Sequence, residues 1–80
     1  MVTVHFYAGL RELAQVASLS MEWHPGMTVT ILRQLISQQL PGVTTLLERS
    51  SIAVNDLVVT DEDIVPDEVD IALLPPVSGG

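Results

Sequence analysis

The sequence contains no cysteine and no lysine, and each absence excludes a kind of chemistry. Without cysteine, the chain cannot form disulfides, thiolate metal sites or iron–sulfur clusters, and it has no cysteine nucleophile. Without lysine, it has no side-chain amine that could accept an isopeptide bond. Any sulfur chemistry of this protein must therefore use an imported sulfur atom.

Positive charge is also scarce. The only basic side chains besides histidine are Arg11, Arg33 and Arg49, against ten acidic residues, and the net charge is −7. So acidic a chain gains little from nucleic acid or from an anionic membrane, and we expect neither as a partner. A protein partner with a basic docking face fits better. The sequence lacks a signal segment and has no apolar run of about 18 residues, so we expect a cytoplasmic protein.

The apolar residues recur with the periods of several strands and one main helix. Alternation predicts strands over residues 2–7, 18–23, 52–54, 57–59 and 69–74. Three- and four-residue spacing from Val29 to Leu40 predicts the main helix, which Thr28 caps and Pro41-Gly42 ends. Residues 8–14 suit a short helical turn, and residues 43–51 suit an irregular connection with one helical turn.

This order predicts an α+β domain over residues 1–74, with a mixed sheet of about five strands and the main helix packed on one face. We expect the last strand to lie beside the first. Residue parity then places four apolar side chains on the opposite face: Tyr7, Val58, Ala72 and Leu74. An open face normally carries polar residues, so this set predicts a partner-docking surface, although single exposed apolar residues are also common.

The other residues that could carry chemistry give weaker signals. His5 and His24 lie on separate elements without nearby ligands, so no metal site is expected. The acidic residues from Asp61 to Asp70 lack the spacing of a calcium loop and suit a solvated turn. Ser78 has no surrounding nucleophile motif, and the glycines form no phosphate-binding loop. We therefore expect neither a catalytic constellation nor a cofactor bound by this chain.

The most informative segment is the tail over residues 75–80, which reads Pro75-Pro76-Val77-Ser78-Gly79-Gly80. The two prolines favour an extended path, so the tail should project as a stiff stalk. Glycines lack a Cβ and can pass through a narrow channel, so the carboxylate of Gly80 could enter the active site of another protein. A frayed chain end is the alternative.

Several segments together resemble the MoaD-like family of sulfur carriers, the small subunits of molybdopterin synthase. The resemblance rests on Phe6-Tyr7-Ala8, Arg11-Glu12-Leu13, Val54-Asn55 and, above all, the tail. It implies a ubiquitin-like β-grasp fold. It also implies that an E1-like, MoeB-like enzyme uses ATP to adenylate Gly80, which then becomes a thiocarboxylate.

The resemblance further implies that the tail, with Pro75, Pro76, Val77, Ser78 and Gly79, enters a MoaE-like large subunit. There the thiocarboxylate would give its sulfur to cyclic pyranopterin monophosphate in molybdenum cofactor biosynthesis. The catalytic residues would then belong to the partners, and the chain itself would not be an enzyme.

One segment departs from the family pattern, because Asp67-Glu68-Val69 stands where the family commonly has an Asp-Gly-Asp turn. This departure leaves the turn type open and does not affect the tail. Carriers for thiamin or cysteine synthesis and ubiquitin-like modifiers share the Gly-Gly ending, so they stay open as alternatives. So does a non-catalytic interaction module that docks through its apolar sheet face.

Overall fold

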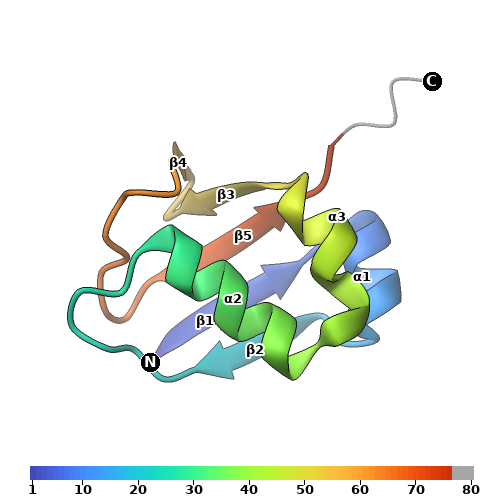
Figure 1. The fold of residues 1–80 in the computed structure, drawn as a ribbon, viewed down its shortest axis with the longest axis horizontal. Helices are drawn as coiled ribbons and strands as arrows, with labels where there is room; N and C mark the ends of the chain where they lie inside the picture. Colours follow the sequence, from blue (N-terminus) through green and yellow to red (C-terminus); the bar gives the residue numbers. More distant parts are fainter. Residues whose placement is uncertain (77–80) are drawn as a thin grey trace.

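The computed structural model describes residues 1–76 and contains one five-stranded mixed sheet with helices across one face (Figure 1). The strands are β1 (Val2–Phe6), β2 (Ser18–Met21), β3 (Ser51–Val54), β4 (Leu57–Val59) and β5 (Asp70–Leu74). The helices are α1 (Ala8–Ala14), α2 (Val29–Gln39), the short 3₁₀-helix η1 (Pro41–Val43) and α3 (Thr44–Glu48). The expected α+β class and sheet are confirmed.

The sheet has the order β2-β1-β5-β3-β4, with β1 and β5 parallel at its centre. The last strand therefore lies beside the first, as predicted. Several predicted boundaries differ from the observed ones by one or two residues, and the structure explains the ends of β1 and β2. The first strand ends at Phe6, because the carbonyl of Tyr7 already accepts the N–H groups of α1. The second ends at Met21, and Trp23 lies beyond it, where its indole donates a 2.7 Å hydrogen bond to the carbonyl of Val65.

Helix α2 begins where the sequence predicts because its first N–H groups find acceptors. The hydroxyl of Thr28 accepts a hydrogen bond from the N–H of Ile31 at 3.2 Å. The backbone carbonyls of Asp63 and Asp61 accept the N–H groups of Val29 and Thr30 at 3.0 and 3.1 Å. The acidic loop is thus more than a solvated turn, because its backbone caps the main helix.

The segment that the sequence left ambiguous folds into η1 and α3, which bury Val43 and Leu47. The half-buried guanidinium of Arg33 fixes this segment from α2. It donates to the carbonyls of Leu47 and Ser50 and, at 3.0 Å, to the carboxylate of Asp61. These bonds join the helix layer to the residue that precedes β3.

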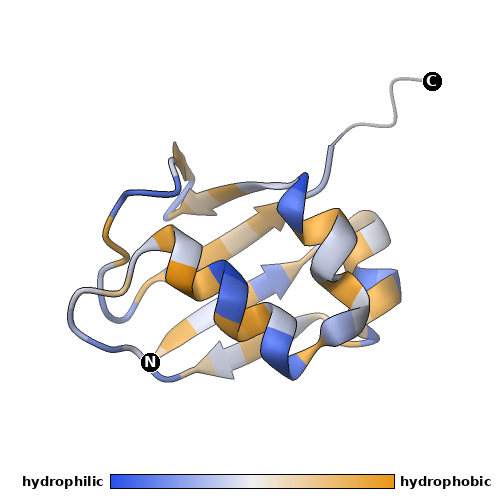
Figure 2. Cartoon of the chain, in the orientation of Figure 1, coloured by the Kyte–Doolittle hydropathy of each residue, from blue (hydrophilic) through white to orange (hydrophobic). Residues whose placement is uncertain are grey.

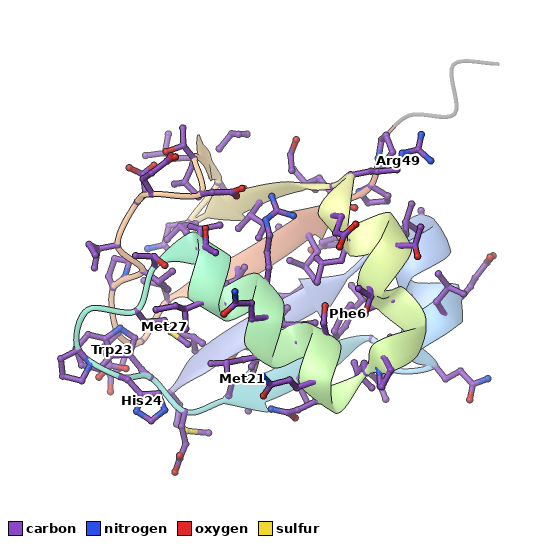
Figure 3. The ribbon with its side chains drawn as sticks, in the orientation of Figure 1. Phe6, Met21, Trp23, His24, Met27 and Arg49 are labelled. Atoms are coloured by element: carbon purple, nitrogen blue, oxygen red, sulfur yellow. The ribbon has the colours of Figure 1, made fainter. Side chains whose placement is uncertain are left out.

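The core lies between the sheet and the helices, and all its members fall between Val2 and Leu73. Phe6 from β1 points from the sheet toward the helices (Figure 3). The buried positions of α2 are Val29, Leu32 and Ile36, and hydrophilic positions alternate with hydrophobic ones along this helix (Figure 2). None of the helices within residues 1–76 has the length and apolar character needed to cross a membrane.

The turn before β5 adopts a left-handed conformation at Glu68, with φ of 55°. The MoaD-like resemblance implies a glycine at this position, and glycine enters that region without a steric cost. The carboxylate of Asp67 accepts the N–H of Glu68 at 2.8 Å and the amino group of Met1 at 2.8 Å. The hydrogen bond from that amino group, the largest influence, lowers the pKa of Asp67 below its ordinary value.

Candidate docking surface and tail root

The face of the sheet opposite the helices exposes the apolar side chains that the sequence placed there. Tyr7 is 48% exposed, Val58 69% and Leu74 38%. Their neighbours Phe6 and Leu73 are 2% and 0% exposed, so one step along the chain moves a side chain from the core to the open face. The docking role of this surface stays a prediction.

Strand register brings the predicted residues of this face into one neighbourhood. Ala72, which is half-buried, pairs with His5 on one side and with Ala53 on the other, and Ala53 pairs in turn with Val58. Ala53 is 4% exposed, so it forms a small buried floor between Val58 and Ala72. Sequence parity assigned Ala53 to no role, although its alternation with Ile52 and Val54 carried the signal.

The root of the tail lies at the end of this surface. Leu74 pairs with Ser51, and the next residues, Pro75 and Pro76, are half-buried and exposed. Arg49, exposed at the end of α3, lies close to the point where the chain leaves β5 (Figure 3). The remaining predicted site residues, Val77, Ser78, Gly79 and Gly80, lie outside the described residues. The division at residue 74 into domain and tail likewise stays a prediction.

A polar pair borders the apolar residues, and no motif in the sequence indicates it. Nε2 of His5 lies 3.1 Å from Oδ1 of Asp70, and both side chains reach solvent. Together with Asn55 and Asp56 they line a shallow hollow beside Tyr7. The parallel pairing of β1 with β5 creates this contact, so only the topology could have predicted it.

The described surface offers binding area more than reactive groups. Among residues 1–76, no three His, Cys, Asp or Glu side chains gather as metal ligands would. Every buried side-chain nitrogen or oxygen in this part of the chain has a hydrogen-bond partner.

Comparisons with solved structures place this architecture among small β-grasp proteins. The putative subunit 1 of molybdopterin converting factor from Pyrococcus furiosus is 25% identical, with a TM-score of 0.85 over 95% of this chain and 97% of that one. The molybdopterin-converting factor complex of subunits 1 and 2 from Helicobacter pylori contains a chain 26% identical, with a TM-score of 0.70 over 99% of this chain and 97% of that one. SAMP1 from Haloferax volcanii, at 18% identity and a TM-score of 0.87 over 99% of this chain and 98% of that one, supports the fold alone.

The fold and surface thus define a ubiquitin-like β-grasp protein. The model of the ThiS family matches residues 4–80, and the chain belongs to this family. No curated protein matches it in sequence. Members of this family are small non-catalytic carrier proteins that an E1-like enzyme adenylates.

Proposed function

We propose that this protein is the sulfur-carrying small subunit of a molybdopterin synthase. In this role Gly80 is adenylated and converted to a thiocarboxylate, which enters a MoaE-like large subunit and gives sulfur to cyclic pyranopterin monophosphate. The observation that carries the proposal is the apolar set of Tyr7, Val58, Ala72 and Leu74 at the root of a Pro-Pro-Val-Ser-Gly-Gly tail. The two structural relatives named as molybdopterin-converting factor subunits support it.

The chemistry asks little of the carrier itself. A carboxylate is a poor acyl donor until one oxygen becomes a good leaving group, and adenylation with release of pyrophosphate supplies one. Sulfide-level sulfur then displaces AMP at the carbonyl of Gly80 and leaves a thiocarboxylate. The activating enzyme and the large subunit provide the acids and bases, whereas this chain provides the docking surface and the tail.

Docking through the open face fits the energetics of protein association. Burial of exposed apolar side chains contributes roughly 25 cal/mol per Å² of apolar area, and part of this is offset by the cost of association. Tyr7 and Leu74 stand next to the root of the tail, so a partner that covers them also receives the residues that follow. One surface can thus serve both the activating enzyme and the large subunit in turn.

A second candidate is a carrier for another sulfur-transfer pathway, such as thiamin synthesis. The match of the ThiS family model over residues 4–80 favours it. This candidate keeps adenylation and thiocarboxylation of Gly80 and changes only the protein that accepts the sulfur. The two candidates therefore differ only at the last step, in the identity of the partner protein that binds the thiocarboxylated chain.

Reconstitution with the E1-like enzyme of the same genome, ATP and a sulfide source tests the proposal. We expect the intact mass of the chain to rise by the difference between sulfur and oxygen, with the change located on Gly80. The product should then convert cyclic pyranopterin monophosphate to molybdopterin when the large subunit is added. A chain that ends at Ser78 is the matched control. Thiocarboxylation without molybdopterin formation would favour the second candidate, and no mass change would contradict both.

A further inference from the structure

Strand β4 forms an edge of the sheet that is far more apolar than the opposite edge. Leu57 and Val58 are 72% and 69% exposed, the highest values among the large apolar side chains of residues 1–76. At the other edge, β2 presents Ser18 and Ser20 to solvent and keeps Leu19 half-buried. Proteins usually protect sheet edges with charged or polar residues, so an apolar edge calls for a partner.

The backbone of β4 is also available for pairing. Asn55 and Asp56 form a two-residue turn with φ of 47° and 71°, and Val54 pairs with Leu57 across it. In such a hairpin the residues that flank the turn bond to each other, so the N–H and C=O of the next residue, Val58, point away from β3. Within residues 1–76 no strand pairs with this outer side of β4 (Figure 1).

An apolar groove runs beside this edge on the helix side of the sheet. It is lined by Leu57, Val59, Ile64 and Pro66, together with the acidic Asp63. Ile64 is 58% exposed although its backbone bridges to Thr28 at the start of α2. A strand added to β4 would place alternate side chains in this groove and the others beside Val58.

The charges around the edge decide what can bind there. Asp56 precedes β4, and Asp61 and Asp63 follow it, all exposed. Asp61 already pairs with Arg33, and the carboxylate of Asp63 accepts the N–H of Thr60 at 2.8 Å, so both are held in place. A second copy of this chain would bring the same acidic groups and a net charge of −7 against them. The negative charge of these acidic groups repels such a copy and attracts a basic segment.

We propose that β4 is a second interaction surface, which receives an extended protein segment with apolar residues at its centre and arginine or lysine at its ends. The segment adds a strand to the sheet through the backbone of Val58, fills the groove beside Leu57 and Ile64, and pairs its ends with Asp56 and Asp63. This surface adjoins the open face through Val58 and makes no use of the tail.

The test uses the full chain, labelled with ¹⁵N, and a synthetic peptide of valines flanked by arginines at both ends. We expect the largest amide shifts at residues 57–59 and 64, and a slowing of hydrogen exchange at the amide of Val58 by tenfold or more. Peptides with glutamates at the ends, or with serines at the centre, should bind at least tenfold more weakly. If the peptide with central serines bound as tightly as the peptide with central valines, binding would depend on charge alone, and the proposal would be overturned.

Paired variants make the test specific. Leu57→Ser should weaken the peptide at least tenfold, whereas Leu13→Ser, at a 51% exposed position on α1, should leave its affinity unchanged. Both substitutions preserve net charge and remove an exposed side chain, so the fold should survive both. Equal affinity of the Leu57 variant and the wild type, or concentration-dependent shifts at Val58 without peptide, would also overturn the proposal. The second outcome would indicate self-association. Because no step involves Gly80, failure of sulfur transfer would leave this result intact.

Discussion

Phe6 and Tyr7 are chain neighbours, as are Leu73 and Leu74, yet the first of each pair is buried under the helices and the second reaches solvent. Leu73 and Leu74 are the same residue type, and Tyr7 differs from Phe6 by one hydroxyl group. The difference in exposure within each pair follows from the alternation of side chains along an extended backbone, which continues from β1 through Tyr7 and sends successive residues to opposite faces. The covered face holds the fold together, and the open face, with the tail that follows it, is where we place recognition and chemistry.

Removal of the tail is the strongest test of this separation between the face that stabilises the fold and the face and tail that carry the proposed function. Deletion of Gly79-Gly80, or extension of the chain beyond Gly80, should abolish sulfur transfer, because only a free terminal carboxylate can be adenylated. The melting temperature should not change, since no member of the described core lies beyond Leu73. Gly80→Ala should be milder and still harmful, because its methyl group must pass a channel suited to glycine. Molybdopterin formation by the deleted chain would disprove the carrier proposal.

Truncation on the covered face should act on stability. Phe6→Ala or Leu73→Ala should lower the free energy of unfolding by about 2 to 5 kcal/mol, because each leaves a cavity among buried side chains. Denaturant unfolding followed by circular dichroism measures this loss. Under conditions where these variants are folded, their affinity for partners should match that of the wild type.

Substitution on the open face should act on binding instead. Tyr7→Asp or Leu74→Glu should weaken binding to the activating enzyme and to the large subunit by tenfold or more, which is about 1.4 kcal/mol. Each change removes apolar contact area and brings an unpaired charge to the interface. Calorimetric titration and thermal melting separate the two effects. If the Leu74 variant unfolds and the Leu73 variant folds without binding, the two faces have been assigned the wrong way round.

Substitution of Glu68 should change the stability of the domain only slightly, because this turn residue lies on neither face of the sheet. A residue other than glycine in the left-handed region costs roughly 1 to 2 kcal/mol, whereas glycine adds an entropy cost of roughly 0.5 to 1 kcal/mol. Glu68→Gly should therefore raise the stability of the domain by at most about 1.5 kcal/mol. Chemical denaturation gives the sign, and a clear loss of stability would show that the Glu68 side chain contributes to the turn.

Substitution of Asp67 should change the stability least, and the size of this change should depend on pH. The hydrogen bond from the amino group of Met1 lowers the pKa of Asp67, so the folded state favours the charged carboxylate. Its contribution is complete above the ordinary pKa of 3.8 and is lost as the pH falls through the lower pKa of the folded protein. The difference in melting temperature between the wild type and Asp67→Asn should therefore narrow on acidification below that value. A difference independent of pH would contradict this origin.

The sequence predicted the features that depend on the local periodicity of hydrophobic residues. It missed the features that depend on contacts between residues far apart in the chain. Alternation was enough to separate Phe6 from Tyr7, and Thr28 marked the start of α2. For residues 43–51 the sequence predicted only an irregular connection with one helical turn, which α3 bears out, because the bonds that fix the segment come from Arg33 on another helix. The contact between His5 and Asp70 needed the parallel pairing of β1 with β5. Strand β2 seemed longer because Trp23 continues its alternation, although its indole binds the Val65 carbonyl in a loop.

The position of β5 also has a mechanical consequence. This strand leads directly into the tail, and it is paired along its length with β1 on one side and β3 on the other. A force that pulls on the tail therefore loads two ladders of hydrogen bonds in shear, and these bonds must break together. We expect extraction from the C-terminal end to need a higher force than peeling from the edge strand β4. Single-molecule pulling from a handle at residue 80 and from one at Leu57, each against the N-terminus, would measure the difference.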